Sequence, residues 1–199
     1  ASMERQLPTL METDFSNIEI KAGGLNHFSI LLEAKYKDTN EDGYPKIRNN
    51  FDKYYSSLVN EHDDYHRSKP GGERGVFFEL YKTYGYLPIT TDSHLGEYLQ
   101  WGYSVADHEA ISHFYNKYKE HCLSFHSDKV SKEHFFDPND LTMRERIVPI
   151  IESIIDDKNM VEDAVNIPNN NFIDNLPKDI VVEVPAVINK NGVQGQRLD

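Results

Sequence analysis

The residue pattern changes twice along this chain, from strand-like to helix-like and back, and this order constrains the fold more than any single motif. Residues 18–21 alternate apolar and charged side chains, and residues 28–32 form a second, mainly apolar run. Between residues 51 and 155 apolar and aromatic residues recur at helical spacing, and short β-type runs return at 164–167 and 180–184. Strands on both sides of a block of helices predict an α+β fold, not alternating βαβ units.

Four helices are expected in the middle of the chain. Their apolar stripes are Phe51–Val59, Phe77–Tyr84, Ile111–Tyr118 and Ile147–Ile155. Gly85 is expected to end the second helix as its C-terminal cap. The fourth helix is expected to open at Thr142, with Glu145 three residues later in a capping-box pattern. Because Pro149 lies inside that pattern, the helix either kinks there or starts later.

Two short motifs near the ends of the chain contain glycine or proline where strands are expected to end. The Gly-Gly pair at 23–24 allows positive φ or close backbone approach, so Asn26 and His27 are expected just past a strand end or bulge. Residues 179–186 are expected to form a strand that stops at Pro185, and the Asn-Gly pair that follows predicts a turn.

Size, charge and cysteine content limit the functional classes. The 199 residues suffice for one domain with a buried core and a small appendage, and the first three, Ala-Ser-Met, resemble the remnant of an expression tag. A net charge of −12 disfavours nucleic acids and anionic membranes as partners. No apolar stretch is long enough to span a bilayer, and no signal peptide is visible. The single cysteine, Cys122, excludes an internal disulfide and fits a cytoplasmic protein.

His27 is the first residue that could carry chemistry. A neutral imidazole is a common ligand of divalent transition metals, and a strand end flanked by glycine would let an ion approach the backbone. The alternative is a structural histidine that is hydrogen-bonded to a neighbouring strand. Residue chemistry alone favours this second reading.

The loop from Tyr86 to His94 is the second candidate. It places a phenol, the carboxylate of Asp92 and an imidazole within ten residues, a combination capable of acid–base catalysis. The alternative is a polar turn in which Asp92 or Ser93 caps a helix that starts near His94. The local sequence favours the cap.

These motifs, in this order and with Val-Asn-Ile-Pro-Asn at 165–169 between them, resemble glycoside hydrolase family 4, the NAD- and manganese-dependent glycosidases. The resemblance covers most of the chain. It implies the C-terminal, substrate- and metal-binding domain of such an enzyme, a domain like the second domain of lactate and malate dehydrogenases. Because no G-x-G-x-x-G follows a strand, the Rossmann domain is expected to be absent. Residues 4–199 are then interpreted as this one domain, truncated at both ends.

The resemblance implies a metal ligand. His27 would bind Mn²⁺, and Asn26 beside it would contact the metal or the substrate. In the family a cysteine of the preceding domain is the second protein ligand. This chain offers no counterpart, because Cys122 lies downstream in a helical stretch.

The resemblance also implies a reaction. NAD oxidises the C3 hydroxyl of the sugar, a base removes the acidified C2 proton, the glycosidic oxygen leaves, water adds and the hydride returns. Asp92 is the first candidate for the base and Tyr86 the second. His94, with Glu97 and Tyr98 after it, resembles the substrate-orienting part of the α-galactosidase and α-galacturonidase branch. An α-galactoside or α-galacturonide is therefore the expected substrate. Without an NAD site the chain alone should be inactive.

Two other functional classes remain open. The chain could be a non-catalytic binding domain derived from the family, which the missing Rossmann half and missing cysteine favour. It could also be the substrate domain of a hydroxy-acid dehydrogenase, but no arginine-rich substrate clamp is evident. The family resemblance further implies a homo-oligomer.

Overall fold

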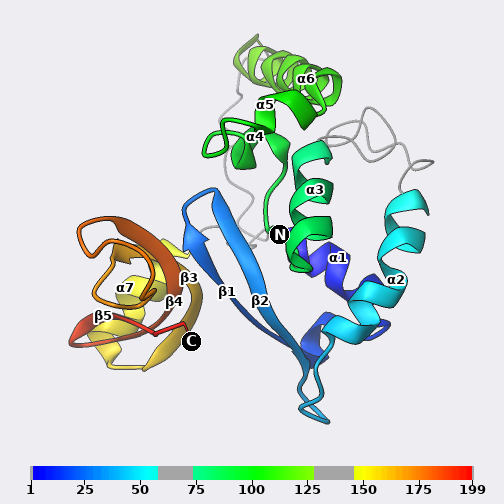
Figure 1. Ribbon diagram of the computed structural model, residues 1–199. Helices are drawn as coiled ribbons and strands as arrows, with labels where there is room; N and C mark the ends of the chain where they lie inside the picture. The colour runs from blue at the N-terminus through cyan, green and yellow to red at the C-terminus, as the bar shows by residue number, and fades with distance from the viewer. Residues whose placement is uncertain (1, 58–73, 128–145, 199) are drawn as a thin grey trace.

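The computed structural model describes residues 2–57, 74–127 and 146–198 (Figure 1). These ranges contain the helices α1 (Ser2–Met11), α2 (Tyr44–Ser57), α3 (Gly75–Tyr84), α4 (Asp92–Leu95), α5 (Gly102–Val105), α6 (His108–Ser127) and α7 (Ile147–Asp156), and a short 3₁₀ turn, η1 (Phe15–Asn17). The strands are β1 (Ile18–Leu25), β2 (Phe28–Tyr36), β3 (Met160–Pro168), β4 (Val181–Asn189) and β5 (Gly192–Gly195). None of the helices in these ranges is long and apolar enough to cross a membrane.

All strand pairings in the described ranges are antiparallel, and the strand order is β2-β1-β4-β3, with β5 also paired to β4. β3 pairs along the length of β4 on one edge. On the other edge β1 pairs at Gly24 with Glu183, and β5 pairs with residues 186–189. The two glycine-containing motifs at opposite ends of the sequence therefore lie next to each other in the sheet.

The predicted α+β fold is confirmed. β1 and β2 occupy the two predicted N-terminal strands, and α2, α3 and α6 cover the first three helical patterns. Gly85 ends α3 with φ 73, and its N–H reaches the Tyr81 carbonyl, as the cap prediction requires. α7 begins at Ile147, so Pro149 falls in its first turn, where its missing N–H costs nothing. The expected helix start at Thr142 and Glu145, and the end of the first helix beyond Ser57, lie outside the described residues.

The prediction that a strand stops at Pro185 is wrong, because β4 continues to Asn189. Pro185 lies where β1 has left the edge of β4 and β5 begins, and its carbonyl accepts a hydrogen bond from Gln196 N at 2.7 Å. On the other edge β3 shifts register between Glu162 and Val165, opposite this point. No ladder bond therefore needs the N–H that proline lacks.

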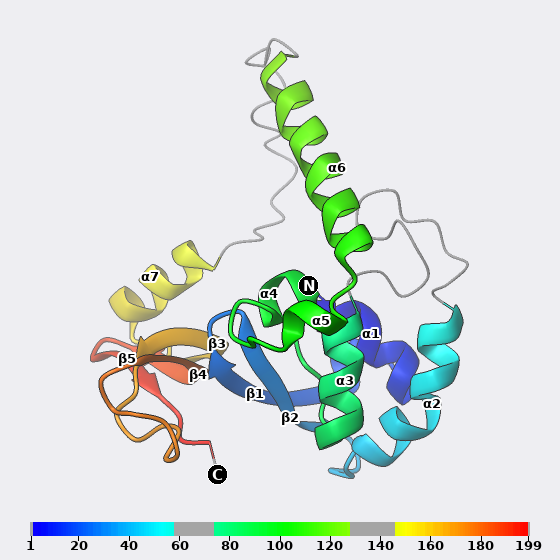
Figure 2. The same cartoon turned by 45° about the horizontal axis from the view of Figure 1, so that its top comes forward.

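Two hydrophobic clusters divide the molecule into a helical part and a smaller sheet part. The larger cluster lies between β1–β2 and helices α1, α2 and α3, and includes fully buried Leu7, Leu31, Ile47 and Phe77. Met3, expected to belong to an expression tag, lies in α1 and is buried in this cluster. The smaller cluster surrounds Val182 and Val184 on β4. The β1–β2 hairpin lies between the two parts, and α6 projects from the body (Figures 1 and 2).

Candidate functional site

The tip of the β1–β2 hairpin carries the predicted metal ligand. Asn26 and His27 form the loop between paired Leu25 and Phe28, and both side chains are exposed. His27 has φ 69, in the left-handed region, which is uncommon for residues other than glycine. Its carbonyl accepts a hydrogen bond from Thr90 Oγ1 at 2.7 Å, which holds the turn. The two-residue loop accounts for this φ, and it leaves the imidazole exposed at the tip.

The segment around α4 lies against this tip. Residues 87–89 run beside β2, with Leu31 N bonded to the Leu87 carbonyl and Ile89 N bonded to the Ser29 carbonyl, both at 2.9 Å. The chain then turns into α4, and Tyr98 donates its hydroxyl hydrogen to the Asn26 carbonyl at 2.7 Å. The Tyr98 ring also packs on Phe28, with ring centroids 5.7 Å apart. These contacts fix the α4 segment on the hairpin.

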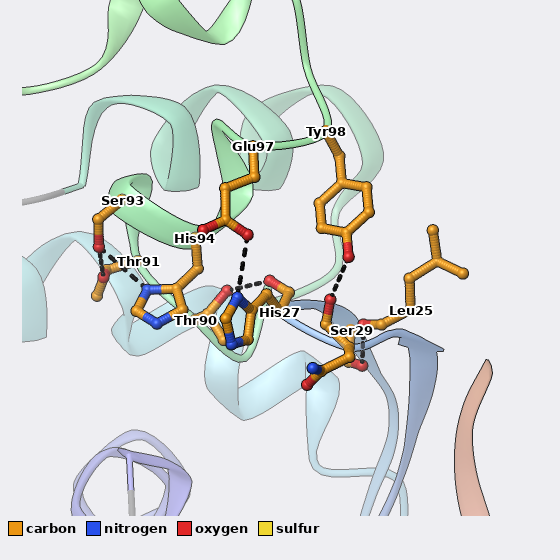
Figure 3. Close-up of polar contacts among 10 residues, drawn as sticks. Leu25, His27, Ser29, Thr90, Thr91, Ser93, His94, Glu97 and Tyr98 are labelled. Carbon is orange, nitrogen blue, oxygen red and sulfur yellow. Dashed lines mark hydrogen bonds and ion pairs between the residues drawn. The ribbon is translucent and has the colours of Figure 1, made fainter. Parts of the chain in front are cut away.

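Two imidazoles meet at this place (Figure 3). The rings of His27 and His94 are in edge contact, with centroids 4.5 Å apart and an interplanar angle of 76°. His27 Nδ1 lies 3.0 Å from Glu97 Oε2, and His94 Nδ1 lies 3.0 Å from Ser93 Oγ. Figure 3 shows both Nε2 atoms on the same side of the pair, away from Glu97 and Ser93. The structure therefore brings together three of the five predicted site residues: Asn26, His27 and His94.

Asp92 begins α4, two residues before His94, but its side chain does not join the tip, and the residue is only 1% exposed. Its Oδ2 accepts hydrogen bonds from Gly75 N at 2.6 Å and Asp107 N at 3.0 Å, and its Oδ1 accepts one from Phe77 N at 3.1 Å. The carboxylate thus joins the start of α3 to the segment before α6. Both oxygens accept hydrogen bonds from backbone N–H groups, so Asp92 acts as a helix cap, which was the alternative to a catalytic base. The helix that it caps is α3 and not α4, which begins at Asp92 itself.

Tyr86 is 41% exposed but lies at the far end of the segment that runs along β2. Four residues of extended chain separate it from Thr90, about 13 Å along the strand. Its ring packs edge-on against Tyr44, with centroids 5.3 Å apart. Burial raises the pKa of Tyr44, so that its phenol keeps the proton it donates to the Leu31 carbonyl. Tyr86 therefore belongs to a different surface from His27.

Glu183 lies directly behind the hairpin. It pairs with Gly24, and Ser29 Oγ donates to its Oε1 at 2.6 Å, with Ser29 only 1% exposed. This contact joins β4 of the sheet part to the hairpin that carries His27. The sequence motif around Glu183 thus has a positioning role in the structure.

Three more residues contact the tip: Thr90, which sequence reasoning missed, and Glu97 and Tyr98, which it named only as following His94 in the substrate-orienting segment. All contact Asn26 or His27 from more than sixty positions away in the sequence, and no local pattern reports such contacts. The signal available was the position of Glu97 and Tyr98 directly after His94 in a loop already singled out. Within the described ranges no group of three or more His, Cys, Asp or Glu side chains is arranged to hold a metal ion.

The left-handed turn gives a stability prediction. His27→Gly and His27→Ala both remove the imidazole, but only glycine adopts positive φ without strain. We expect His27→Gly to be more stable than His27→Ala by about 1 kcal/mol in urea unfolding, after the greater chain entropy of glycine is subtracted. An alanine variant as stable as the glycine variant would mean that the turn relaxes out of the left-handed region.

Comparisons of the sequence with known proteins all indicate the same family. Residues 22–199 match the sequence profile of the family 4 glycosyl hydrolase C-terminal domain. An α-glucosidase of Erwinia rhapontici is 39% identical over 223 aligned residues, which cover 100% of this chain and 47% of that enzyme. An α-galacturonidase of Thermoanaerobacter italicus is 26% identical, over 92% of this chain and 42% of the enzyme.

Solved structures show the same fold. A putative glucosidase of Bacillus subtilis superposes with a TM-score of 0.62 at 25% identity, over 98% of this chain and 46% of that one. A 6-phospho-α-glucosidase from gut microorganisms, solved with NAD and Mn²⁺, superposes with a TM-score of 0.59 at 16% identity, over 99% of this chain and 44% of that one. This second likeness shows the fold alone. The chain spans about half the length of the relatives it matches.

Proposed function

Because this chain belongs to family 4 of the glycosyl hydrolases, whose C-terminal domain it matches over residues 22–199, we propose that it is the substrate- and metal-binding part of a glycosidase. The substrate is an α-linked glycoside of a hexose or hexuronate. The α-glucosidase and α-galacturonidase relatives support this class, and the higher identity of the α-glucosidase adds α-glucosides to the expected α-galactosides and α-galacturonides.

The observation that carries the proposal is the exposure and hydrogen bonding of the His27 imidazole. Its side chain is 43% exposed at the hairpin tip, Nδ1 is held by Glu97, and no described residue hydrogen-bonds to Nε2. A carboxylate on one imidazole nitrogen with the other nitrogen open is the usual arrangement of a metal-binding histidine. His27 could therefore supply one imidazole ligand to a divalent metal ion, and Asn26 lies beside it in the chain. We place the family's NAD site in a Rossmann domain outside these residues.

When bound, the two cofactors supply a hydride acceptor and a Lewis acid for the sugar hydroxyl groups. The residues of this chain bind and orient the sugar and move a proton. His94 and the loop around it face the space beside His27, so they contact the substrate. The proton acceptor must lie within hydrogen-bond reach of the sugar C2 position. Of the candidates, the half-exposed phenol of Tyr98 lies at the tip, whereas Asp92 and Tyr86 do not. Its hydroxyl donates to the Asn26 carbonyl, so Tyr98 would act as the acceptor only as a phenolate that has released this hydrogen bond.

Two proteins test the proposal that this chain supplies the substrate and metal site while another domain supplies the NAD site. The 199-residue chain alone should not hydrolyse aryl α-glucosides or α-galacturonides when NAD, Mn²⁺ and reductant are added. A chimera in which this chain replaces the matching part of the Erwinia rhapontici α-glucosidase should hydrolyse them, and His27→Ala in the chimera should abolish Mn²⁺-dependent turnover while the melting temperature is kept. NAD-dependent turnover by the chain alone would contradict the proposal.

The proton acceptor is tested by exchange of the C2 hydrogen in the active chimera. We expect Tyr98→Phe to slow wash-out of C2 deuterium into solvent by about 10²–10⁴-fold, the usual contribution of a general base. Tyr86→Phe is the matched control, since it removes the same hydroxyl from a tyrosine that lies away from His27. If Tyr98→Phe keeps full C2 exchange and Tyr86→Phe loses it, the proton acceptor is Tyr86.

Homo-oligomer formation stays a prediction of the family resemblance, and a cytoplasmic location stays a prediction from the single cysteine. Light scattering on the chimera and on the chain alone would measure the first.

A further inference from the structure

We propose that His27 and His94 together form a two-imidazole site for one divalent transition-metal ion, with Glu97 and Ser93 holding the rings. This inference deepens the proposed function, on which it rests for the role of His27, and it changes the role of His94 from orienting substrate to binding metal. The remaining coordination positions are left to water or to substrate oxygens, as in catalytic metal sites that keep an open position.

The protonation pattern is the first support. An ionised carboxylate only accepts hydrogen bonds, so the contact of 3.0 Å between His27 Nδ1 and Glu97 Oε2 requires the proton on Nδ1. In the neutral imidazole the lone pair is then on Nε2, which is the form that binds metal. Ser93 Oγ lies 3.0 Å from His94 Nδ1 and can accept its proton in the same way. With Ser93 as the acceptor, both rings present Nε2.

The distance between the rings is the second support. A metal bonded to Nε2 at the usual distance lies about 3.2 Å from the ring centroid, so two imidazoles on one ion at 90–110° have centroids about 4.5–5.2 Å apart. The rings of His27 and His94 have centroids 4.5 Å apart. Figure 3 shows that both Nε2 atoms lie on the same side of the pair, away from Glu97 and Ser93.

The backbone supplies a third support. The left-handed φ of His27 is fixed by Thr90 Oγ1, and the α4 segment is fixed to the tip by Tyr98. Both rings are therefore held by contacts that do not involve a metal ion. A site that is formed before the ion binds loses less conformational entropy on binding.

The test titrates the 199-residue chain with Co²⁺ alone, because imidazole ligands suit this ion and its visible absorption reports the ligands. Wild-type chain, His27→Ala, His94→Ala, the double variant and a control, His113→Ala on α6, are compared by calorimetry and absorption. We expect both single variants to weaken Co²⁺ binding more than about 10-fold, and the double variant to be little weaker than either, because each loss breaks the same chelate. His113→Ala should bind like the wild type.

A second measurement needs no metal. Long-range ¹H–¹⁵N spectra of the imidazoles should show His27 with its proton on Nδ1, and Glu97→Ala should move that proton to Nε2 and weaken Co²⁺ binding about 10–100-fold. If His27→Ala loses binding and His94→Ala keeps it, the two-imidazole site is wrong and the proposed function stands. If neither variant changes binding, the role of His27 as a metal ligand fails as well.

Discussion

Replacing Asp92 by alanine should lower the free energy of unfolding by about 3–5 kcal/mol, because it leaves three buried backbone N–H groups without an acceptor, each costing about 1–3 kcal/mol before relaxation. For a chain of this size the melting temperature should fall by roughly 6–20 °C. Chemical and thermal unfolding of the chain measure both quantities. Asp52→Ala, at an exposed aspartate on α2, is the matched control and should change the unfolding free energy by less than about 0.5 kcal/mol.

Asp92→Asn separates a structural carboxylate from a catalytic base. The amide keeps the shape of the side chain but turns an N–H group toward at least one of the three backbone donors, so we expect a loss of about 1–3 kcal/mol. A catalytic base would behave differently: Asp92→Asn would keep the stability and lose C2 exchange in the active chimera. Unchanged unfolding in Asp92→Ala would show that the three N–H groups find other partners.

The elements that the sequence predicted well are those set by local chemistry. The hairpin follows from alternation in residues 18–21 and the apolar run after the glycines, and the end of α3 follows from Gly85, where nothing lies within 4 Å of an added Cβ and only the positive φ requires glycine. The family resemblance is confirmed by the matched domain. The resemblance indicated which domain this is and drew attention to His27, whereas the α+β fold followed from the order of strand-like and helix-like patterns.

The elements that the sequence did not predict depend on contacts between distant residues. β4 passes Pro185 because a bulge in β3 and the boundary between β1 and β5 coincide there. Asp92 accepts N–H groups from residues fifteen and seventeen positions earlier, so a reading confined to its own turn could not find its partners. Glu97 meets His27 across seventy positions. Such contacts exist only once the hairpin and the α4 segment have packed together.

A second large destabilisation is expected at Asn169, the last residue of the Val-Asn-Ile-Pro-Asn motif. It is 1% exposed, and its Nδ2 lies within hydrogen-bond distance of the carbonyls of Ile173, Leu176 and Pro177, at 2.9, 3.1 and 3.0 Å. Its Oδ1 accepts from Ile173 N at 3.0 Å. The side chain therefore organises the loop from 170 to 180, which packs beside β4. Asn169→Ala should cost about 2–4 kcal/mol, since these groups lose their partners in a site with little access to water.

Asn169→Asp is the sharper variant, because it changes one atom and leaves the shape alone. The new carboxylate oxygen would face three carbonyl oxygens, so at neutral pH we expect a loss at least as large as that of Asn169→Ala. Repulsion and burial raise the pKa of the introduced carboxyl in the folded state above its unfolded value of about 3.9. The folded state then binds the proton more tightly, so the variant loses stability as pH rises from about 4 through the raised pKa and regains it on acidification.

Asn170→Asp, at the exposed neighbouring residue, controls for the added charge. Urea unfolding of both variants between pH 4 and 8 gives the test, and parallel pH profiles would show that the Asn169 amide does not hold the loop.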